Sequence, residues 1–375
     1  MKTILCILTV LCLIVSAGNT LAKESVKIGL ITPLTGDVKT YGESVKNAFT
    51  IAVEEYGKTG KYSIQTVIAD DRNDATEGAN AALKLVTQDK VAAIVGPVTS
   101  KVAIPVSVIA TQYKVPMITG TATNPKVTIS EGKRKPYVFR ACFIDPFQGV
   151  VAANFALKDL KTKTAAILYD VSNDYSKGLG EYFKSTFTKG KGTIVAVESY
   201  QKDDVDFSAL VTKVALKKPD LIFLPDYYNK VALIARQIRE KGIRSILLGG
   251  DGWDSPELLK IGGNAITGGY FVNHYSPDRK DPVAESFIKK YKARYGIVPD
   301  AFAAMAYDAA GILFKALDAA SKPRSEDILK ALAPTKKYKG VTGVISFDAN
   351  GDALKSAVIL NVEKTGFKYV TTVNP

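Results

Sequence analysis

Short strand-like runs alternate with helix-like patterns along the chain from residue 26 onward. Residues 26–31 (VKIGLI) have the β-branched and apolar character of a buried strand. After a loop, apolar side chains recur at the spacing of one helix face: Val45, Ala48, Phe49, Ala52, Val53 and Tyr56. This spacing predicts an amphipathic helix that ends at Gly57.

The same alternation repeats in the first third of the chain. Residues 64–69 and 91–95 predict strands, and apolar positions between 79 and 86 predict a helix. Another helix is expected to begin near Ser100, and Pro105 fits it only if it lies in the first turn. Strands separated by helices in this way are typical of α/β proteins with parallel sheets.

A second series of strands and helices begins after Asp145. Strands are expected at 165–169, 194–199, 221–224 and 245–248, and the clearest helix face carries Val231, Ile234, Ala235 and Ile238. Helices dominate 282–333, and three more strands are expected at 344–347, 357–362 and 367–370. Because no low-complexity linker separates the two series, the pattern predicts two doubly wound α/β lobes with parallel sheets, joined by multiple hinge strands.

The first 22 residues have a different character from the rest of the chain. Lys2 precedes an almost unbroken apolar run from Ile4 to Val15, and small residues follow before the first charged stretch at Lys23. This is the layout of a secretory signal peptide, and the run is too short to span a bilayer comfortably. Cleavage near Ala22 is expected, which predicts an exported, periplasmic and soluble protein.

Cysteine usage agrees with this interpretation. Cys6 and Cys12 fall within the expected signal peptide, so Cys142 stands alone in the mature chain and no internal disulfide is expected. Lipidation of Cys12 is the alternative, but Val10 and Leu11 do not provide the small residues that usually precede a lipidated cysteine.

Composition narrows the class of protein further. A length of 375 residues with 46% apolar and 23% charged residues suits a soluble protein of two domains. The net charge of +13 raises the question of nucleic-acid or membrane-surface binding. Lysine and arginine are scattered, however, with no basic stripe interleaved with aromatic residues, so a solvated surface and no nucleic-acid partner are expected.

Residue types that enzymes use are scarce in this chain. His274 is the single histidine, so any Ser-His-Asp or Cys-His triad would have to use it. No Gly-x-Ser-x-Gly nucleophile elbow is present. A lone histidine is more often structural or on the surface than catalytic. One histidine and one mature cysteine cannot assemble a His/Cys metal site, and phosphate-binding glycine motifs are absent. The expected protein is no enzyme and needs no metal or cofactor.

Two neighbouring loops suggest a ligand site at one end of the first sheet. Residues 96–100 (GPVTS) connect a strand to the helix that starts near Ser100, and the first backbone N–H groups of a helix attract anions. The next strand ends in the hydroxyl-rich segment 119–125 (TGTATNP), which contributes Thr121 and Thr123. Together these loops offer uncharged donors for a carboxylate. A helix cap and an ordinary turn would give the same pattern.

A third loop places an acid after a buried strand of the second series. Asp251 lies in the glycine-rich segment 249–252 (GGDG). In a cleft it could accept charge-assisted hydrogen bonds from an ammonium group, and otherwise it is a turn or cap residue.

These features together resemble the periplasmic leucine/isoleucine/valine-type binding proteins, which have the type I periplasmic-binding-protein fold. The resemblance covers essentially the whole mature chain. It rests on residues 27–36, the Asp70-Asp71 pair, residues 122–125 (ATNP), residues 206–210 (DFSAL) and the Asp251 loop, in this order.

The resemblance implies roles for individual residues. Ser100, Thr121 and Thr123, with Ala122 between them, match the family positions that hold the ligand carboxylate and part of its ammonium group. Asp251 matches the acid, often glutamate, that binds the ammonium. The family's aromatic positions around the ligand correspond to Tyr41, Tyr175 and Tyr227.

Three departures from the family pattern stand out. Cysteines near Asn73 and Thr99, which form a disulfide in some relatives, are missing. Aspartate at 251 is one methylene shorter than glutamate, and Tyr41 takes a position where tryptophan is common. The last two changes leave the ligand open between leucine, isoleucine or valine and a polar amino acid or amide.

The resemblance also implies a mechanism and partners. The expected lobes are residues 23–144 with 275–345, and residues 145–274 with 346–375. A small amino acid would bind between them by hinge closure, and the closed, monomeric protein would dock on the membrane permease of an ABC transporter. The alternative is a ligand sensor of the same fold that binds an amide or other small molecule and signals to a receptor or regulator.

Overall fold

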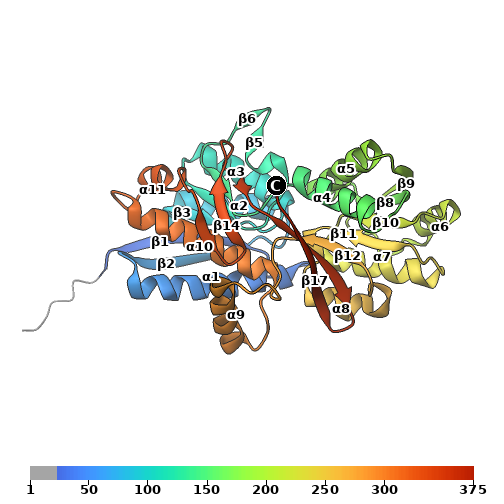
Figure 1. Cartoon of the computed structure of the whole chain (residues 1–375). Coiled ribbons are helices and arrows are strands. Elements are labelled where there is room, and N and C mark those ends of the chain that lie inside the picture. The colour runs from blue at the N-terminus through green and yellow to red at the C-terminus, as the bar shows by residue number, and fades with distance from the viewer. Residues whose placement is uncertain (1–22) are drawn as a thin grey trace, which may run out of the picture.

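The computed structural model describes residues 23–375 as two α/β lobes that lie side by side (Figure 1). The expected signal peptide at residues 1–22 lies outside the described residues. The first lobe is built on a parallel sheet of five strands. Its strands, in spatial order, are β2 (Ser63–Asp70), β1 (Ser25–Thr32), β3 (Ala93–Val95), β4 (Met117–Thr119) and β7 (Val138–Arg140).

The second lobe is built on a sheet of seven strands. Their spatial order is β17 (Gly366–Val373), β16 (Ala357–Glu363), β12 (Tyr270–Asn273), β11 (Ile246–Gly249), β10 (Leu221–Leu224), β8 (Thr164–Asp170) and β9 (Thr193–Tyr200). The strands from β12 to β9 are parallel, whereas β16 runs antiparallel to β12 and β17 antiparallel to β16. Because the turn between β16 and β17 is only two residues long, these two strands can pair only in antiparallel fashion.

Helices pack against both sheets. Those of the first lobe are α1 (Lys39–Thr59), α2 (Ala75–Lys84), α3 (Ser100–Gln112), α9 (Pro282–Tyr295), α10 (Ala301–Ala319) and α11 (Ser325–Leu332). Those of the second lobe are α4 (Asp145–Lys158), α5 (Asp174–Lys189), α6 (Ser208–Lys217), α7 (Tyr228–Glu240) and α8 (Pro256–Gly262). The predicted α/β fold of two parallel-sheet lobes is therefore confirmed.

Short elements complete the chain. They are a π-helical turn (Leu85–Asp89), 3₁₀ turns (Pro125–Val127, Asp251–Trp253, Gly263–Ala265), the hairpin of β5 (Ile129–Ser130) and β6 (Lys133–Arg134), and the small sheet of β13 (Tyr338–Gly340), β14 (Gly343–Phe347) and β15 (Ala353–Leu354).

Strand periodicity explains why the first sheet is covered on both faces. Leu30 belongs to the cluster that includes α1 and α10, whereas its neighbour Ile31 belongs to the cluster that includes α2 and α3. Val95 and Ile94 divide between the two clusters in the same way. Because successive side chains of a strand point to opposite faces, both faces of these apolar strands are buried.

Two local predictions need correction. Helix α1 continues through Gly57 to Thr59 and is capped by Gly60, whose amide donates to the Tyr56 carbonyl, because Gly57 does not adopt the positive φ that ends a helix at glycine. Pro105 is the sixth residue of α3 rather than part of its first turn. The helix accommodates it although proline has no N–H to donate to the preceding turn.

Between residues 23 and 375 the chain crosses between the lobes three times. The crossings follow β7, β12 and β15. The expected boundary after residue 345 falls inside β14, and the chain beyond it still belongs with the first lobe, since the Gly351 carbonyl accepts from the Arg140 amide at 3.0 Å. Asp352 also accepts from the Thr128 hydroxyl at 2.8 Å.

Helix α1 offers a matched test of how closely it packs. A Cβ on Gly42 would lie 1.9 Å from the Pro33 carbonyl oxygen, whereas one on Gly57 would have no neighbour within 4 Å. We expect Gly42→Ala to lower the free energy of unfolding by about 3 kcal/mol through overpacking. Gly57→Ala should raise it by about 0.5–1 kcal/mol, because alanine favours helix. Urea unfolding followed by circular dichroism measures both, and equal effects would contradict the close approach.

Candidate functional site

The residues singled out from the sequence gather at the carboxyl ends of strands from both lobes. Ser100 begins α3 after β3, and residues 120–124 follow β4. In the second lobe Tyr175 lies in the first turn of α5, Tyr227 immediately precedes α7, and Asp251 follows β11. Open α/β sheets usually bind ligands at this edge.

One small cleft between the lobes is lined by six of these residues. Its walls are Val98, Thr99, Ser100, Thr121, Thr123, Tyr175, Tyr227, Asp251, Gly252 and Phe302, and in this closed form its cavity volume is only about 10 Å³. We call it the interlobe cleft. Two predicted residues, Tyr41 and Ala122, are absent from its wall.

The wall formed by the first lobe presents hydrogen-bond donors without a charged group. The Ser100 hydroxyl accepts from the Asn124 amide at 3.1 Å, and the Thr121 hydroxyl donates to the Val98 carbonyl at 2.6 Å, so the two loops support each other. Within the described chain, the amides of Ser100 and Thr123 have no hydrogen-bond partner. Two free amides beside a helix N-terminus suit a carboxylate.

Ala122 faces away from the cleft. Its amide donates to the Thr119 hydroxyl at 3.1 Å, and its carbonyl accepts from the Arg140 guanidinium at 2.8 Å. These bonds hold the loop that carries Thr121 and Thr123. The contribution of Ala122 is therefore to the shape of the loop.

The wall formed by the second lobe contains a buried carboxylate with three partners. Oδ1 of Asp251 accepts from the Gln148 amide at 3.0 Å and from the Tyr175 hydroxyl at 2.8 Å. Oδ2 lies 3.0 Å from Nε2 of His274. Gln148 also accepts from the Asp251 amide at 2.9 Å, so it binds both the side chain and the backbone of Asp251. The alternative of a simple turn aspartate does not describe this arrangement.

Glycine at position 250 leaves the space in which Gln148 and Tyr175 contact Asp251. A Cβ there would lie 2.2 Å from Oε1 of Gln148 and 2.6 Å from the Tyr175 hydroxyl. Any larger residue would displace the two groups that hold Asp251.

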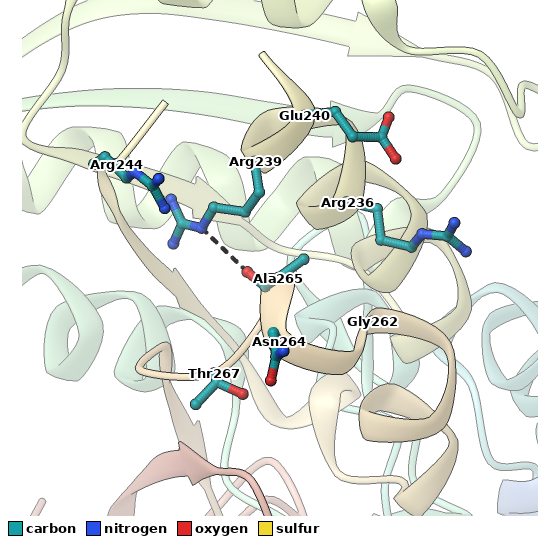
Figure 2. A pocket seen from close by; sticks show the side chains of 8 residues that line it. All are labelled: Arg236, Arg239, Glu240, Arg244, Gly262, Asn264, Ala265 and Thr267. Atoms are coloured by element: carbon teal, nitrogen blue, oxygen red, sulfur yellow. Dashed lines mark hydrogen bonds between the residues drawn. The ribbon is translucent and has the colours of Figure 1, made fainter. Parts of the chain in front are cut away.

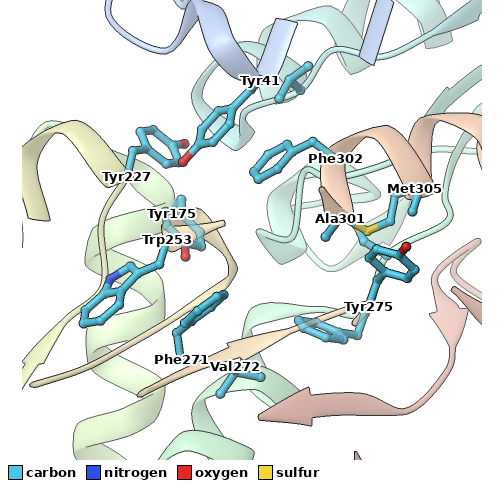
Figure 3. Packing of buried hydrophobic residues seen from close by; sticks show 14 of the residues in the cluster. Tyr41, Tyr175, Tyr227, Trp253, Phe271, Val272, Tyr275, Ala301, Phe302 and Met305 are labelled. Atoms are coloured by element: carbon cyan, nitrogen blue, oxygen red, sulfur yellow. The ribbon is translucent and has the colours of Figure 1, made fainter. Parts of the chain in front are cut away.

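Aromatic rings from both lobes surround the cleft (Figure 3). Tyr41 stacks on Phe302 with ring centroids 3.8 Å apart, and its hydroxyl donates to the Gly252 carbonyl of the other lobe. Tyr175 and Tyr227 are parallel, 5.3 Å apart. Tyr41 therefore lies one layer behind the wall, supports Phe302 and joins the lobes.

Further direct contacts between the lobes show that the cleft is closed. The Asn124 side chain donates to the Asp174 carbonyl at 2.9 Å, and Lys126 pairs with the Asp174 carboxylate at 2.8 Å. The Tyr228 hydroxyl donates to the Asp37 carbonyl at 3.3 Å.

Burial changes the acid–base properties of two groups near the cleft. Burial raises the pKa of Asp145 to about 8, and nearby Asp251 adds to the rise, whereas the positive charge of Arg140 opposes it. Neither oxygen of the Asp145 carboxyl has a hydrogen-bond partner in the described structure. Burial lowers the pKa of His274 to about 4, although the contact with Asp251 opposes the change. At neutral pH the imidazole is uncharged.

Three residues at or next to the site were not predicted from the sequence: Phe302, Gln148 and His274. Phe302 and Gln148 lie within helices whose apolar patterns give no sign of a site. One feature of the sequence does point to His274 as a site residue: it is the single histidine of the chain and directly follows the strand-like run 270–273.

Asn73 and Thr99, near which the resemblance places a disulfide of some relatives, are joined by a hydrogen bond in this protein. The Thr99 hydroxyl donates to Oδ1 of Asn73 at 2.8 Å, and both residues are buried. Cys142, a free and buried thiol, lies in another part of the lobe.

A second hollow lies on the surface of the second lobe (Figure 2). It is lined by Arg236, Arg239, Glu240, Arg244, Gly262, Asn264, Ala265 and Thr267. Arg239 donates to the carbonyls of Ile243, Ser245 and Ala265 and so serves the local fold. None of the residues predicted for the site contributes to it.

Among residues 23–375, no helix is long and apolar enough to cross a membrane, and no group of three or more His, Cys, Asp or Glu side chains could hold a metal ion.

Two lobes with three crossings, closed over a small cleft at the carboxyl ends of both sheets, define a hinged binding protein. Residues 25–366 match the periplasmic binding protein family model, and the chain belongs to this family. The predicted assignment to the Leu/Ile/Val-binding type is confirmed by its relatives.

Three of these relatives illustrate the match. Leu/Ile/Val-binding protein BraC3 of Rhizobium johnstonii is 36% identical over 336 residues, which cover 88% of this chain and 90% of BraC3. The crystal structure of the leucine-binding protein LivK of Thermotoga maritima is 39% identical, with a TM-score of 0.89, covering 93% of this chain and 99% of LivK. LivJ of Streptococcus pneumoniae, solved with isoleucine, is 32% identical, with a TM-score of 0.88, covering 94% of this chain and 100% of LivJ.

The buried carboxyl of Asp145 gives a prediction for stability against pH. Since its pKa is about 8 in the native protein and about 4 in an unfolded chain, only the unfolded chain loses this proton between pH 4 and pH 8. The native state is therefore destabilised as pH rises through this window. We therefore expect the difference in unfolding free energy between Asp145→Asn and the wild type to change in favour of the variant. The change should be about 1 kcal/mol for each pH unit within this window.

Urea unfolding at pH 5, 6, 7 and 8 measures this difference. Asp203→Asn is the control, because Asp203 is exposed and makes no side-chain hydrogen bond in the described structure. Its difference from the wild type should not depend on pH. Parallel curves for Asp145→Asn and the wild type would show that the native carboxyl titrates normally.

Proposed function

We propose that this protein captures a small aliphatic amino acid, namely leucine, isoleucine or valine, in the interlobe cleft for an ABC uptake transporter. The proposal rests on one observation: hydrogen-bond donors of one lobe and a carboxylate of the other face the same small cleft. The first lobe offers the free amides of Ser100 and Thr123, and the second offers the Asp251 carboxylate. This pair suits the carboxylate and the ammonium of one zwitterion.

The remaining wall supports an apolar side chain. Phe302, Tyr175 and Tyr227 contribute ring surface, and Val98 adds an aliphatic group. Apolar surface removed from water stabilises binding by about 25 cal/mol per Å², so a branched aliphatic chain suits this part of the cleft. The relatives agree with this size and polarity, since LivK is a leucine-binding protein and LivJ was solved with isoleucine.

The wider role extends the same proposal. Residues 1–22 direct export to the periplasm, and the mature protein acts as a monomer without cofactor, nucleic acid or catalysis. The moving lobes are residues 23–144 with 275–355, and residues 145–274 with 356–375, which shifts one expected boundary to the crossing after β15. The closed form is the one presented to a membrane permease.

Ligand binding is tested first by thermal shift with each amino acid and several amides, and then by calorimetry. A ligand at about 100 times its Kd stabilises the native state by about 2.7 kcal/mol. We expect leucine, isoleucine or valine to give the largest shift. A shift by an amide or by a carboxylic acid without an amine, and by no amino acid, would exclude the proposed ligand class.

The ammonium role of Asp251 is tested by Asp251→Asn, which keeps the shape of the side chain. Loss of one partner of a buried charge pair costs about 2–5 kcal/mol, so leucine affinity should fall by about 30-fold or more. Asp203→Asn is again the control and should bind like the wild type. Unchanged affinity in Asp251→Asn would remove Asp251 from the site.

The lobe-joining contact of Tyr41 gives a further prediction. Tyr41→Phe keeps the stack on Phe302 but loses the hydrogen bond to the Gly252 carbonyl. Because a hydrogen bond contributes about 0.5–1.5 kcal/mol, leucine affinity should fall by about 2- to 12-fold. Tyr113→Phe, at an exposed tyrosine, should leave calorimetric affinity unchanged. Equal affinities for both variants would show that the contact does not favour closure.

A further inference from the structure

We infer that His274 is a positioning residue that links the hinge between the lobes to the ammonium end of the ligand site. The inference rests on the proposed function, because it assigns Asp251 to the ligand's ammonium group. It concerns a residue that lies outside the wall of the interlobe cleft.

His274 lies in the second crossing, between β12 and α9, and its backbone is held on both sides. Its amide donates to Oδ1 of Asn273 at 2.8 Å. The Asn273 side chain donates in turn to Asp254 at 2.8 Å and to the Tyr275 carbonyl at 3.2 Å. The position of the imidazole is thus set by the path of the crossing.

The imidazole bridges two crossings and reaches the site acid. It stacks on Phe143, which lies in the first crossing, with ring centroids 3.6 Å apart. Its Nε2 lies 3.0 Å from Oδ2 of Asp251, and the side chain is fully buried. A hinge motion that changes the two crossings relative to each other would therefore move the group that holds Asp251.

The chemistry of the pair defines which proton is involved. A carboxylate only accepts hydrogen bonds, so the uncharged imidazole must carry its proton on Nε2 and donate it to Asp251. Nδ1 has no partner in the described structure. Burial and Lys355, which lies in the third crossing, disfavour a second proton on the ring.

The consequence is an acid whose orientation depends on the hinge. Gln148 and Tyr175 occupy Oδ1, and His274 fixes the rotation of the carboxylate through Oδ2. One lone pair of Oδ2 then remains for an ammonium N–H of the ligand. Because the aspartate side chain is short, Oδ2 can reach the ammonium group only in this orientation. His274 fixes that orientation in the closed form.

Two variants separate the hydrogen bond from the ring. His274→Phe keeps a ring that can stack on Phe143 but loses the N–H donor, and His274→Gln keeps an N–H donor but loses the ring. The ligands are leucine and 4-methylpentanoate, which is leucine without its amine. Calorimetry on the mature protein, free of any histidine tag, gives the affinity for each.

We expect His274→Phe to weaken leucine binding by about 10-fold or more, as for other hydrogen bonds to charged groups. Binding of 4-methylpentanoate should not change, and His274→Gln should recover most of the leucine affinity. Tyr275→Phe is the control in the same crossing, since the Tyr275 hydroxyl has no partner in the described structure. An equal loss for both ligands, or no loss for leucine, would overturn the inference.

A spectroscopic test does not depend on ligand affinity. Because the chain has one histidine, its imidazole ¹⁵N signals are assigned without ambiguity. We expect a proton on Nε2 and none on Nδ1 from pH 5.5 to 8, and a shift of the Nε2 signal when leucine is added. A proton on Nδ1, or titration near pH 6.5, would overturn the contact. If the wild type binds no amino acid but shows the Nε2 tautomer, the proposed function fails while the contact stands.

Discussion

The buried carboxylate of Asp251 is the constraint on which the cleft depends. A charge removed from water needs several hydrogen-bond donors, and a missing one is costly. Gln148 from α4, Tyr175 from α5 and His274 from the second crossing supply these donors. Each donor fixes the place of one element around the cleft. The acid is therefore a reason for this arrangement of the second lobe as well as a candidate ligand contact.

The first lobe has a counterpart in the buried guanidinium of Arg140. It donates to the carbonyls of Ala122 and Asn124, on either side of Thr123, and lies 2.6 Å from the Asp352 carboxylate near the third crossing. Both halves of the site are thus tied to segments that cross between the lobes. A binding site built in this way has its geometry set by the hinge and not only by each lobe alone.

The sequence was most informative where a pattern is local. Apolar runs located strands such as β10, and the residues at their carboxyl ends located Ser100 and Asp251, because strand ends in an α/β sheet share one edge. Local patterns could not show that Ala122 turns away, since this depends on Arg140, 18 positions further along the chain. His274 lies 23 positions from Asp251, and only the fold brings them together.

Closure of the lobes depends on contacts of unequal strength. Lys126 and Asp174 are largely exposed, with 67% and 40% of their side chains accessible, so water weakens their pairing and it contributes little. The bond from the buried Tyr41 hydroxyl to the Gly252 carbonyl is shielded from water and contributes more. Such contacts exist only when the lobes meet, so they favour closure before any ligand is counted. A ligand adds only the difference between its binding to the closed and open forms. Groups from both lobes around one cleft make that difference large, because an open cleft offers a ligand only one of its two walls.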